Sequence, residues 1–102
     1  MIHVIATIEL NPGCRVRYLE VLKRNVPTVL AEKGCLRYEP TVEIDSGLPA
    51  QRGARADVVT LLESWSGLDT LQAHLKTPHM AAYREEAKAF VKQVRLNVLA
   101  PT

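Results

Sequence analysis

Residues 58–79, VVTLLESWSGLDTLQAHLKTPH, contain one strand and the starts of two helices, and they decide the fold. The first part, from Val58 to Trp65, is rich in β-branched and aromatic residues and predicts a strand. Because side chains alternate along a strand, one of its faces is expected to carry Val59, Leu61, Glu63 and Trp65.

Two helix starts follow this strand. Ser66 and Asp69 fit the Ser-x-x-Asp capping pattern, which predicts a short helix that carries Leu68, Leu71 and Leu75. Thr77-Pro78 predicts a second start, because threonine is a good N-cap and proline is favoured at the first helical position. The apolar face of this second helix is expected to hold Met80, Tyr83, Ala87, Phe90 and Val94.

The chain before this stretch adds two strands and a longer helix. Residues 2–10 predict a strand that ends at an Asn-Pro-Gly turn signal. An amphipathic helix that ends at Lys33-Gly34 is predicted from Val16, Leu19, Leu22, Val26 and Val29. Pro27 removes one backbone hydrogen bond inside this helix and predicts a kink.

Residues 36–44 alternate between apolar and polar side chains and predict a half-buried strand. Pro40 cannot donate a hydrogen bond to a neighbouring strand, so this strand should be a sheet edge or carry a bulge. Residues 45–57 hold two glycines, a proline and four charged residues, and predict a mobile, peripheral loop. The alternation from Val94 to Ala100 predicts a last strand.

The predicted order is strand, helix, strand, strand, helix, helix, strand, which is a split βαβ arrangement of the α+β ferredoxin-like class. Right-handed crossovers put all helices on one face of a four-stranded antiparallel sheet. The other face is expected to carry apolar side chains from the first, third and fourth strands. Because a second copy would cover such a face, the sequence predicts a homodimer.

The composition is that of a single soluble domain spanning residues 1–102, with 47% hydrophobic and 24% charged residues. The net charge of +2 is spread along the chain, which predicts no nucleic-acid partner, and no apolar run predicts a membrane span. The N-terminus has no secretory signal pattern, so a cytoplasmic location is expected. Cys14 and Cys35 bracket a helix about 30 Å long and are expected to be reduced thiols.

One set of residues has functional character: Glu63-x-Trp65, followed by His74 and by Thr77-Pro78-His79. This pattern closely resembles the antibiotic biosynthesis monooxygenase family, of the dimeric α/β-barrel superfamily. Residues 34–39, GCLRYE, and residues 11–13, NPG, resemble further segments of the same family. The loop of residues 45–57 looks longer than is usual there.

The resemblance implies a small ferredoxin-like dimer, a dimeric α/β barrel, with a pocket between sheet and helices in each subunit. Many members oxidise small phenolic or quinol-type substrates with O₂ and use no metal, flavin, haem or other cofactor. A base removes a proton from the substrate, and the resulting anion passes an electron to O₂. Such a pocket should be apolar, with one or two polar groups that orient the substrate.

The candidate catalytic residues are His79, Trp65 and His74, and the candidate substrate-binding residues are Tyr83, Met80, Glu63, Thr7 and Phe90. His79 is the first candidate for the base, because the start of a helix disfavours a charged imidazole. Each has a structural alternative. His79 could hydrogen-bond Glu63, His74 could find a local partner at the flank of its helix, and Trp65 could be core.

A metal site at His74 and His79 is not expected, because five residues of helix would turn them to different faces and Pro78 interrupts the helix. Haem-degrading relatives carry an asparagine on the first strand and a histidine in the last helix, where this chain has Thr7 and Arg84. Haem breakdown is therefore disfavoured. Two alternatives stay open: a non-oxidative enzyme such as an isomerase, and a non-catalytic module that binds a small ligand.

Overall fold

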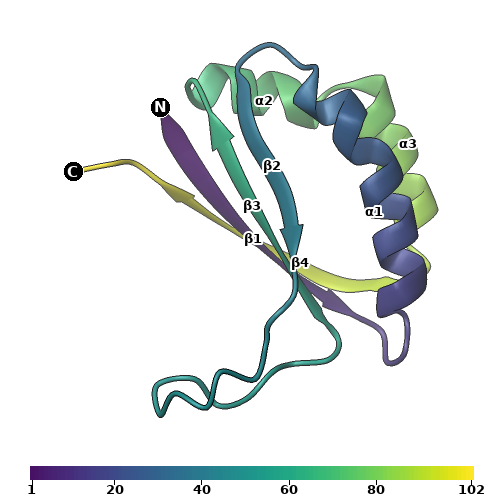
Figure 1. Ribbon diagram of the computed structural model, residues 1–102. Helices are drawn as coiled ribbons and strands as arrows, with labels where there is room; N and C mark the ends of the chain where they lie inside the picture. Colours follow the sequence, from purple (N-terminus) through teal and green to yellow (C-terminus); the bar gives the residue numbers. More distant parts are fainter.

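The computed structural model describes residues 1–102 and contains four strands and three helices (Figure 1). In chain order the elements are β1 (Ile2–Leu10), α1 (Arg15–Leu30), β2 (Cys35–Thr41), β3 (Val58–Trp65), α2 (Leu68–Leu75), α3 (Pro78–Ala87) and β4 (Val91–Leu99). The predicted order of elements is confirmed, and β1 and β3 have the predicted bounds.

The strands form one antiparallel sheet with the order β2-β3-β1-β4. The helices lie on one side of it, with α1 packed against β2 and α3, and α2 against β3 (Figure 1). This arrangement is the ferredoxin-like α+β fold predicted from the sequence.

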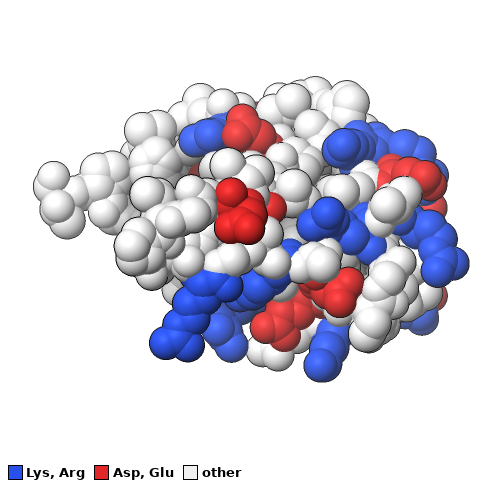
Figure 2. All heavy atoms as spheres, turned by 60° about the horizontal axis from the view of Figure 1, so that its bottom comes forward, with Lys and Arg blue, Asp and Glu red and all other residues white.

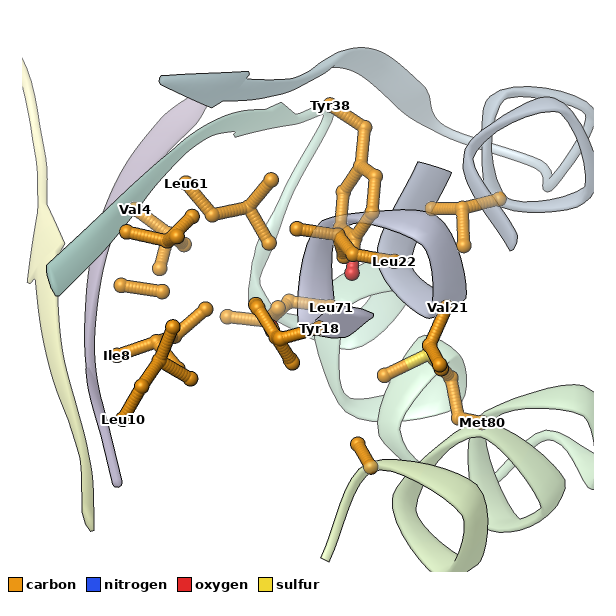
Figure 3. Close-up of a cluster of buried hydrophobic side chains, with 14 of the residues drawn as sticks. Val4, Ile8, Leu10, Tyr18, Val21, Leu22, Tyr38, Leu61, Leu71 and Met80 are labelled. Atoms are coloured by element: carbon orange, nitrogen blue, oxygen red, sulfur yellow. The ribbon is translucent and has the colours of Figure 1, made fainter. Parts of the chain in front are cut away.

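The core lies between the sheet and the helices, and the alternation of β1 supplies much of it. Val4, Ala6, Ile8 and Leu10 are buried, whereas the residues between them keep part of their surface exposed. Figure 3 shows the side chains of Val4, Ile8 and Leu61 pointing from the sheet toward those of the helices. Burial of this face is what holds the helices to the sheet.

Helix α1 turns most of its predicted apolar face to the core: Leu22 and Val29 are buried, and Leu19 and Val26 pack against the core cluster. Its buried residues are Tyr18, Val21, Leu22 and Val29, whereas Val16 is 72% exposed. The interpretation of Val16 as a core residue is wrong because Tyr18, a larger side chain, occupies the core side of the first turn. Pro27 lies inside the helix, close to its end.

Strand β2 is a sheet edge, as predicted from Pro40, and its register shifts between Cys35 and Arg37. The bulge leaves Leu36 59% exposed while Tyr38 is buried. The strand ends at Thr41, so the predicted extension to residue 44 is wrong, and Ile44 is exposed.

The starts of the last two helices were predicted with mixed success. Thr77 caps α3 and its Oγ1 accepts a hydrogen bond from the Met80 N–H, as predicted. The N-cap of α2 is Gly67 rather than Ser66, and Thr70 Oγ1 bonds both the N–H and the C=O of this glycine. Helix α3 ends at Ala87, so the expected continuation of its apolar face to residues 90 and 94 is wrong.

The apolar side chains of β4 lie on the helix side of the sheet. Val94, Leu96 and Val98 pair with Ile8, Ala6 and Val4, which are the core-facing residues of β1. They are nevertheless 43–53% exposed, since the helices leave this edge of the sheet uncovered. This pairing corrects the expectation that the apolar residues of all three strands share the outer face.

Residues 42–57 form a loop that extends away from the body of the protein (Figure 1). Within it, the Arg55 guanidinium donates to both carboxylate oxygens of Glu43. On the face drawn in Figure 2, basic and acidic residues are interspersed rather than separated by sign. None of the helices combines the length and the hydropathy that crossing a bilayer requires.

Candidate active site

A cavity of about 200 Å³ lies between the sheet and helices α2 and α3. Its walls are mostly apolar: Val4, Ala6, Ile8, Leu61, Leu71, Leu75, Met80, Val94 and Leu96. Five polar residues complete the lining: Tyr38, Glu63, His74, Tyr83 and Arg84. An apolar chamber with a few convergent polar groups is the usual form of a small-molecule site.

The cavity is lined on one side by residues that keep contact with solvent. Val94 and Leu96 of β4 are about half exposed, and Arg84 of α3 is exposed. The Arg84 Nη2 donates to the carbonyl of Leu75, 3.1 Å away, which fixes the guanidinium beside the end of α2. A cation is therefore held beside the cavity.

His74 is buried, with 2% of its surface exposed, although the sequence placed it at the flank of α2. Its ring lies against Trp65, with centroids 4.6 Å apart, and against Tyr38, with centroids 5.6 Å apart. The Nδ1 atom of His74 lies 2.8 Å from Oε2 of Glu32, so this nitrogen donates its proton to the carboxylate. Burial lowers the pKa of His74 despite this carboxylate.

The turn after α1 holds Glu32 in position. The Glu32 N–H donates to the carbonyl of Val29, and the carbonyl of Glu32 accepts from the N–H of Cys35. Gly34 has a φ of +81°, and a Cβ there would lie 2.5 Å from atoms of Ser66 and Thr70. Only glycine suits this close approach to the start of α2, which fixes the turn that carries Glu32 against that helix.

His79 binds the same oxygen from the opposite side. Its Nε2 lies 2.8 Å from Glu32 Oε2, and its side chain is 27% exposed. His79 does not line the cavity; it lies in a surface depression with Val21, Asn25 and Tyr83, among others. One carboxylate oxygen therefore joins a histidine of the cavity to a histidine of the surface.

Glu63 is buried on β3, and its Oε1 accepts a hydrogen bond of 2.9 Å from Trp65 Nε1. Burial raises the pKa of Glu63 to about 7, even though the bond from Trp65 opposes the rise. Near neutral pH this carboxyl group therefore exists both as acid and as carboxylate.

Nε2 of His74 and Oε2 of Glu63 are polar atoms of the cavity lining that have no hydrogen-bond partner in the protein. No fully buried side-chain nitrogen or oxygen lacks a hydrogen bond. These two atoms must therefore retain open surface, and the open space that both residues line is the cavity. A bound molecule would meet one imidazole nitrogen and one carboxyl oxygen.

Two tyrosines add phenol groups to this region. The hydroxyl of Tyr83 bonds that of Tyr18, and burial raises the pKa of both phenols. Tyr38 lines the cavity as well, and burial raises its pKa in the same direction. All three phenols are neutral at physiological pH and act as hydrogen-bonding groups.

Comparison with known families identifies this chain, because residues 1–86 match the model of the antibiotic biosynthesis monooxygenase family. The chain belongs to that family. A protein of Escherichia coli K12 named probable quinol monooxygenase YgiN is 40% identical over 103 residues, covering 99% of this chain and 98% of its own length.

Solved structures agree on the fold. A conserved protein from Methanosarcina mazei superposes with a TM-score of 0.83 at 20% identity, covering 99% of this chain and 92% of that one. The protein Rv0793 from Mycobacterium tuberculosis superposes with a TM-score of 0.81 at 24% identity, covering 99% and 94%. Both share the ferredoxin-like architecture of this family member.

The structure brings some of the predicted site residues to the cavity and leaves others outside. His74, Glu63, Met80 and Tyr83 line it. Trp65 does not; it is fully buried behind His74 and Glu63 and contacts both. Trp65 therefore orients two lining residues from the core side.

Two expected lining residues are corrected. Thr7 pairs with Thr60 and Arg95 and lies on the outer face of the sheet, because the period of two in β1 turns its even-numbered residues toward the helices. Phe90 lies in the turn beyond α3, where its ring contacts the Arg17 guanidinium, because the helix ends before reaching it.

The sequence reasoning missed Glu32 and misjudged the two histidines. They approach each other because they belong to two helices separated by a tight turn, so the argument from one continuous helix does not apply. Glu32 has one warning sign in the sequence: a carboxylate just beyond the C-terminus of a helix is repelled by the helix dipole unless a tertiary partner holds it. Glu32, His74 and His79 offer three donor atoms within 4.8 Å of one another, and are the residues that could hold a metal ion.

Proposed function

We propose that this family member is a cofactor-independent monooxygenase that oxidises a small phenolic or quinol-type substrate with O₂. The observation that carries the proposal is the arrangement of His74, whose Nδ1 is held by Glu32 while its Nε2 faces an apolar cavity. The family and the relative named as a quinol monooxygenase support a monooxygenase-type reaction.

His74 acts as the base in this proposal. The carboxylate of Glu32 fixes the tautomer with the proton on Nδ1, which leaves the lone pair of Nε2 toward the substrate. Once Nε2 has taken a proton, the same carboxylate stabilises the imidazolium. The lowered pKa of His74 keeps the ring neutral, and therefore ready to accept a proton, near pH 7.

The cavity suits a substrate with one or two rings. Its volume of about 200 Å³ lies below the usual range for drug-sized ligands, and its walls are mostly aliphatic. Tyr38 and Glu63 are placed to hydrogen-bond a substrate hydroxyl. The Arg84 guanidinium beside the cavity favours the anion that proton removal creates.

The reaction balances without a further reductant. His74 removes a hydroxyl proton, the substrate anion gives one electron to O₂, and the two radicals combine into a peroxide. His74 returns its proton to the peroxide, and the O–O bond then breaks as the ring carbon loses its hydrogen as a proton. One oxygen atom stays on the ring as a carbonyl, and the other leaves as water with these two protons. A hydroquinone and O₂ thus give a hydroxyquinone and water, with all four electrons supplied by the substrate.

Oxygen uptake tests the proposal. Metal-free protein is mixed with chemically reduced quinols of one and two rings, and O₂ consumption and product mass are followed with 18O₂. We expect one labelled oxygen atom per product and uptake above the uncatalysed rate. Conversion without O₂ uptake would favour the isomerase alternative, for which Glu63 and His74 supply two proton-transferring groups in one cavity. Binding without conversion would favour a ligand-binding module.

A homodimer is part of the same proposal. The outer face of the sheet carries the partly exposed Ile5 and Leu62 among polar residues, and none of the three helices of the chain covers it. A second copy packed on this face would bury these side chains and complete the dimeric barrel that the family resemblance implies.

A further inference from the structure

We propose that Glu32, His74 and His79 form a binding site for a divalent transition metal of the zinc class. The site lies beside the cavity, on the far side of the His74 ring from the substrate. Its existence does not depend on the proposed function, because it is argued from the donor atoms alone.

The donor set is chemically suited to such an ion. Two imidazole nitrogens and one carboxylate oxygen are ligands that Zn²⁺ binds, and three protein ligands with one open position are typical of reactive zinc sites. His74 Nδ1 and His79 Nε2 each lie 2.8 Å from Glu32 Oε2, and all three atoms lie within 4.8 Å of one another. Ligands around zinc stand about 3.0–3.4 Å apart, so the two histidine nitrogens, which lie within 4.8 Å of each other, must approach by up to about 1.4 Å to seat the ion.

The side chains of His74 and Glu32 are already ordered in the protein without a metal ion. His74 is 2% exposed and packed by Trp65 and Tyr38, and the side chain of Glu32 is 13% exposed on a turn that Gly34 fixes. Such ordering reduces the conformational entropy lost on binding.

His79 supplies the entrance. Its side chain is the most exposed of the three and lines a surface depression of about 190 Å³, from which an ion and a water ligand can reach the donors. Arg24 also lines this depression, but its guanidinium is paired with Glu86, which partly offsets its repulsion of a cation.

Occupation of this site would change the state of the base. A metal on Nδ1 of His74 takes the lone pair of that nitrogen, so the proton of the neutral ring moves to Nε2, which then donates into the cavity and no longer accepts. No proton is lost from the ring in this shift. This consequence rests on the proposed function: Zn²⁺ should slow oxygen uptake, and a chelator should restore it.

The test is a Zn²⁺ titration of chelator-treated protein by calorimetry, with native mass spectrometry to count ions. We expect one Zn²⁺ per chain. His79→Gln should weaken binding by at least about a hundredfold, since even partners behind the ligands are worth tenfold to a hundredfold. The matched control is His3→Gln, because His3 lies on the outer face of β1, where it bonds Ser64, and is not one of the three ligands. It should bind Zn²⁺ as the wild type does.

Thermal melts of the same proteins show whether each variant is folded and whether Zn²⁺ stabilises it. Zn²⁺ should raise the Tm of the wild type and of His3→Gln, because an ion that binds only the folded state stabilises it. It should not raise the Tm of a cooperatively melting His79→Gln protein. The absence of stoichiometric binding, or equal binding by wild type and His79→Gln, would overturn the proposal. The Zn²⁺ titration and the thermal melts need no substrate. They therefore test the metal site even if the protein shows no oxygen uptake.

Discussion

The Nδ1 atom of His74 lies 2.8 Å from Oε2 of Glu32, a residue 42 positions earlier in the chain. Within helix α2 itself, the Nδ1 atom of this buried histidine has no hydrogen-bond partner; Glu32 supplies one. The carboxylate gives its ring a defined tautomer and orientation, and turns the free nitrogen to the cavity. In the proposed mechanism, the orientation of the base therefore depends on the turn that ends α1.

Replacing His74 by glutamine tests its role as the base. His74→Gln should lower turnover about a hundredfold or more, the usual contribution of a positioned acid–base group. His79→Gln should cost less than tenfold, because His79 lies outside the cavity and touches the base only through Glu32. Oxygen-uptake kinetics and melting curves of both variants make the comparison. A larger loss in His79→Gln, in a protein that still folds, would return the base to His79.

Much of the fold could be predicted from local patterns. Alternation and turn residues placed β1 and β3 correctly, and Thr77-Pro78 marked the start of α3. The errors occurred where tertiary contacts override the local pattern. The bulge at Cys35 turns Leu36 outward, and α1 buries Tyr18 instead of Val16. Periodicity predicts that a face exists, but larger side chains and strand register decide which residues occupy it.

The candidate site was only partly predictable. Spacing within the Glu63–His79 segment identified two residues, His74 and Glu63, that line the cavity. Glu32 could not be assigned from spacing, because its contact with His74 depends on how the turn after α1 meets the end of α2. The different placements of His74 and His79 likewise follow from the angle between two helices, which a one-dimensional pattern does not contain.

Glu63 should make stability depend on pH. Its pKa rises from an ordinary value of 4.5 to about 7 on folding, so the folded protein holds a proton that the unfolded chain releases. Stability contributed by this group therefore falls as pH rises between these two values, by on the order of 3 kcal/mol in total. Glu63→Gln, which cannot ionise, should gain stability relative to wild type between about pH 5 and about pH 8.

Urea unfolding at both pH values measures this difference. Glu39→Gln, an exposed change on β2, is the control and should show a constant difference from wild type. A constant difference for Glu63→Gln as well would mean that this carboxyl group ionises equally in the folded and unfolded states.

Trp65 should be more important for stability than for chemistry. Trp65→Ala removes a fully buried indole and should cost about 3–5 kcal/mol in the free energy of unfolding. Trp65→Phe keeps most of the apolar volume but removes the N–H that bonds Glu63, so it should fold and bind substrate more weakly. Denaturant titrations and KM values separate the two effects. Equal destabilisation by both variants would make the bond to Glu63 the main contribution.

Shortening the loop should leave the fold intact. Residues 46–52 lie between Glu43 and Arg55 in a segment that extends from the body, so replacing them with two glycines should change the Tm little. Differential scanning calorimetry measures this change. A large fall in Tm would show that the loop packs against something, and a fall that depends on protein concentration would locate that contact on a partner subunit.

The outer face of the sheet should be the dimer interface. Ile5 and Leu62 are register partners in the middle of this face, so Leu62→Glu places a charge where a second copy is expected to pack. Sedimentation at micromolar concentration should show a dimer for the wild type and a monomer for Leu62→Glu. Leu96→Glu supplies the control, because Leu96 is a similarly apolar strand residue on the helix side of β4. It should remain dimeric. A wild-type protein that is a stable, folded monomer, or a Leu62→Glu protein that stays dimeric, would exclude this face as the interface.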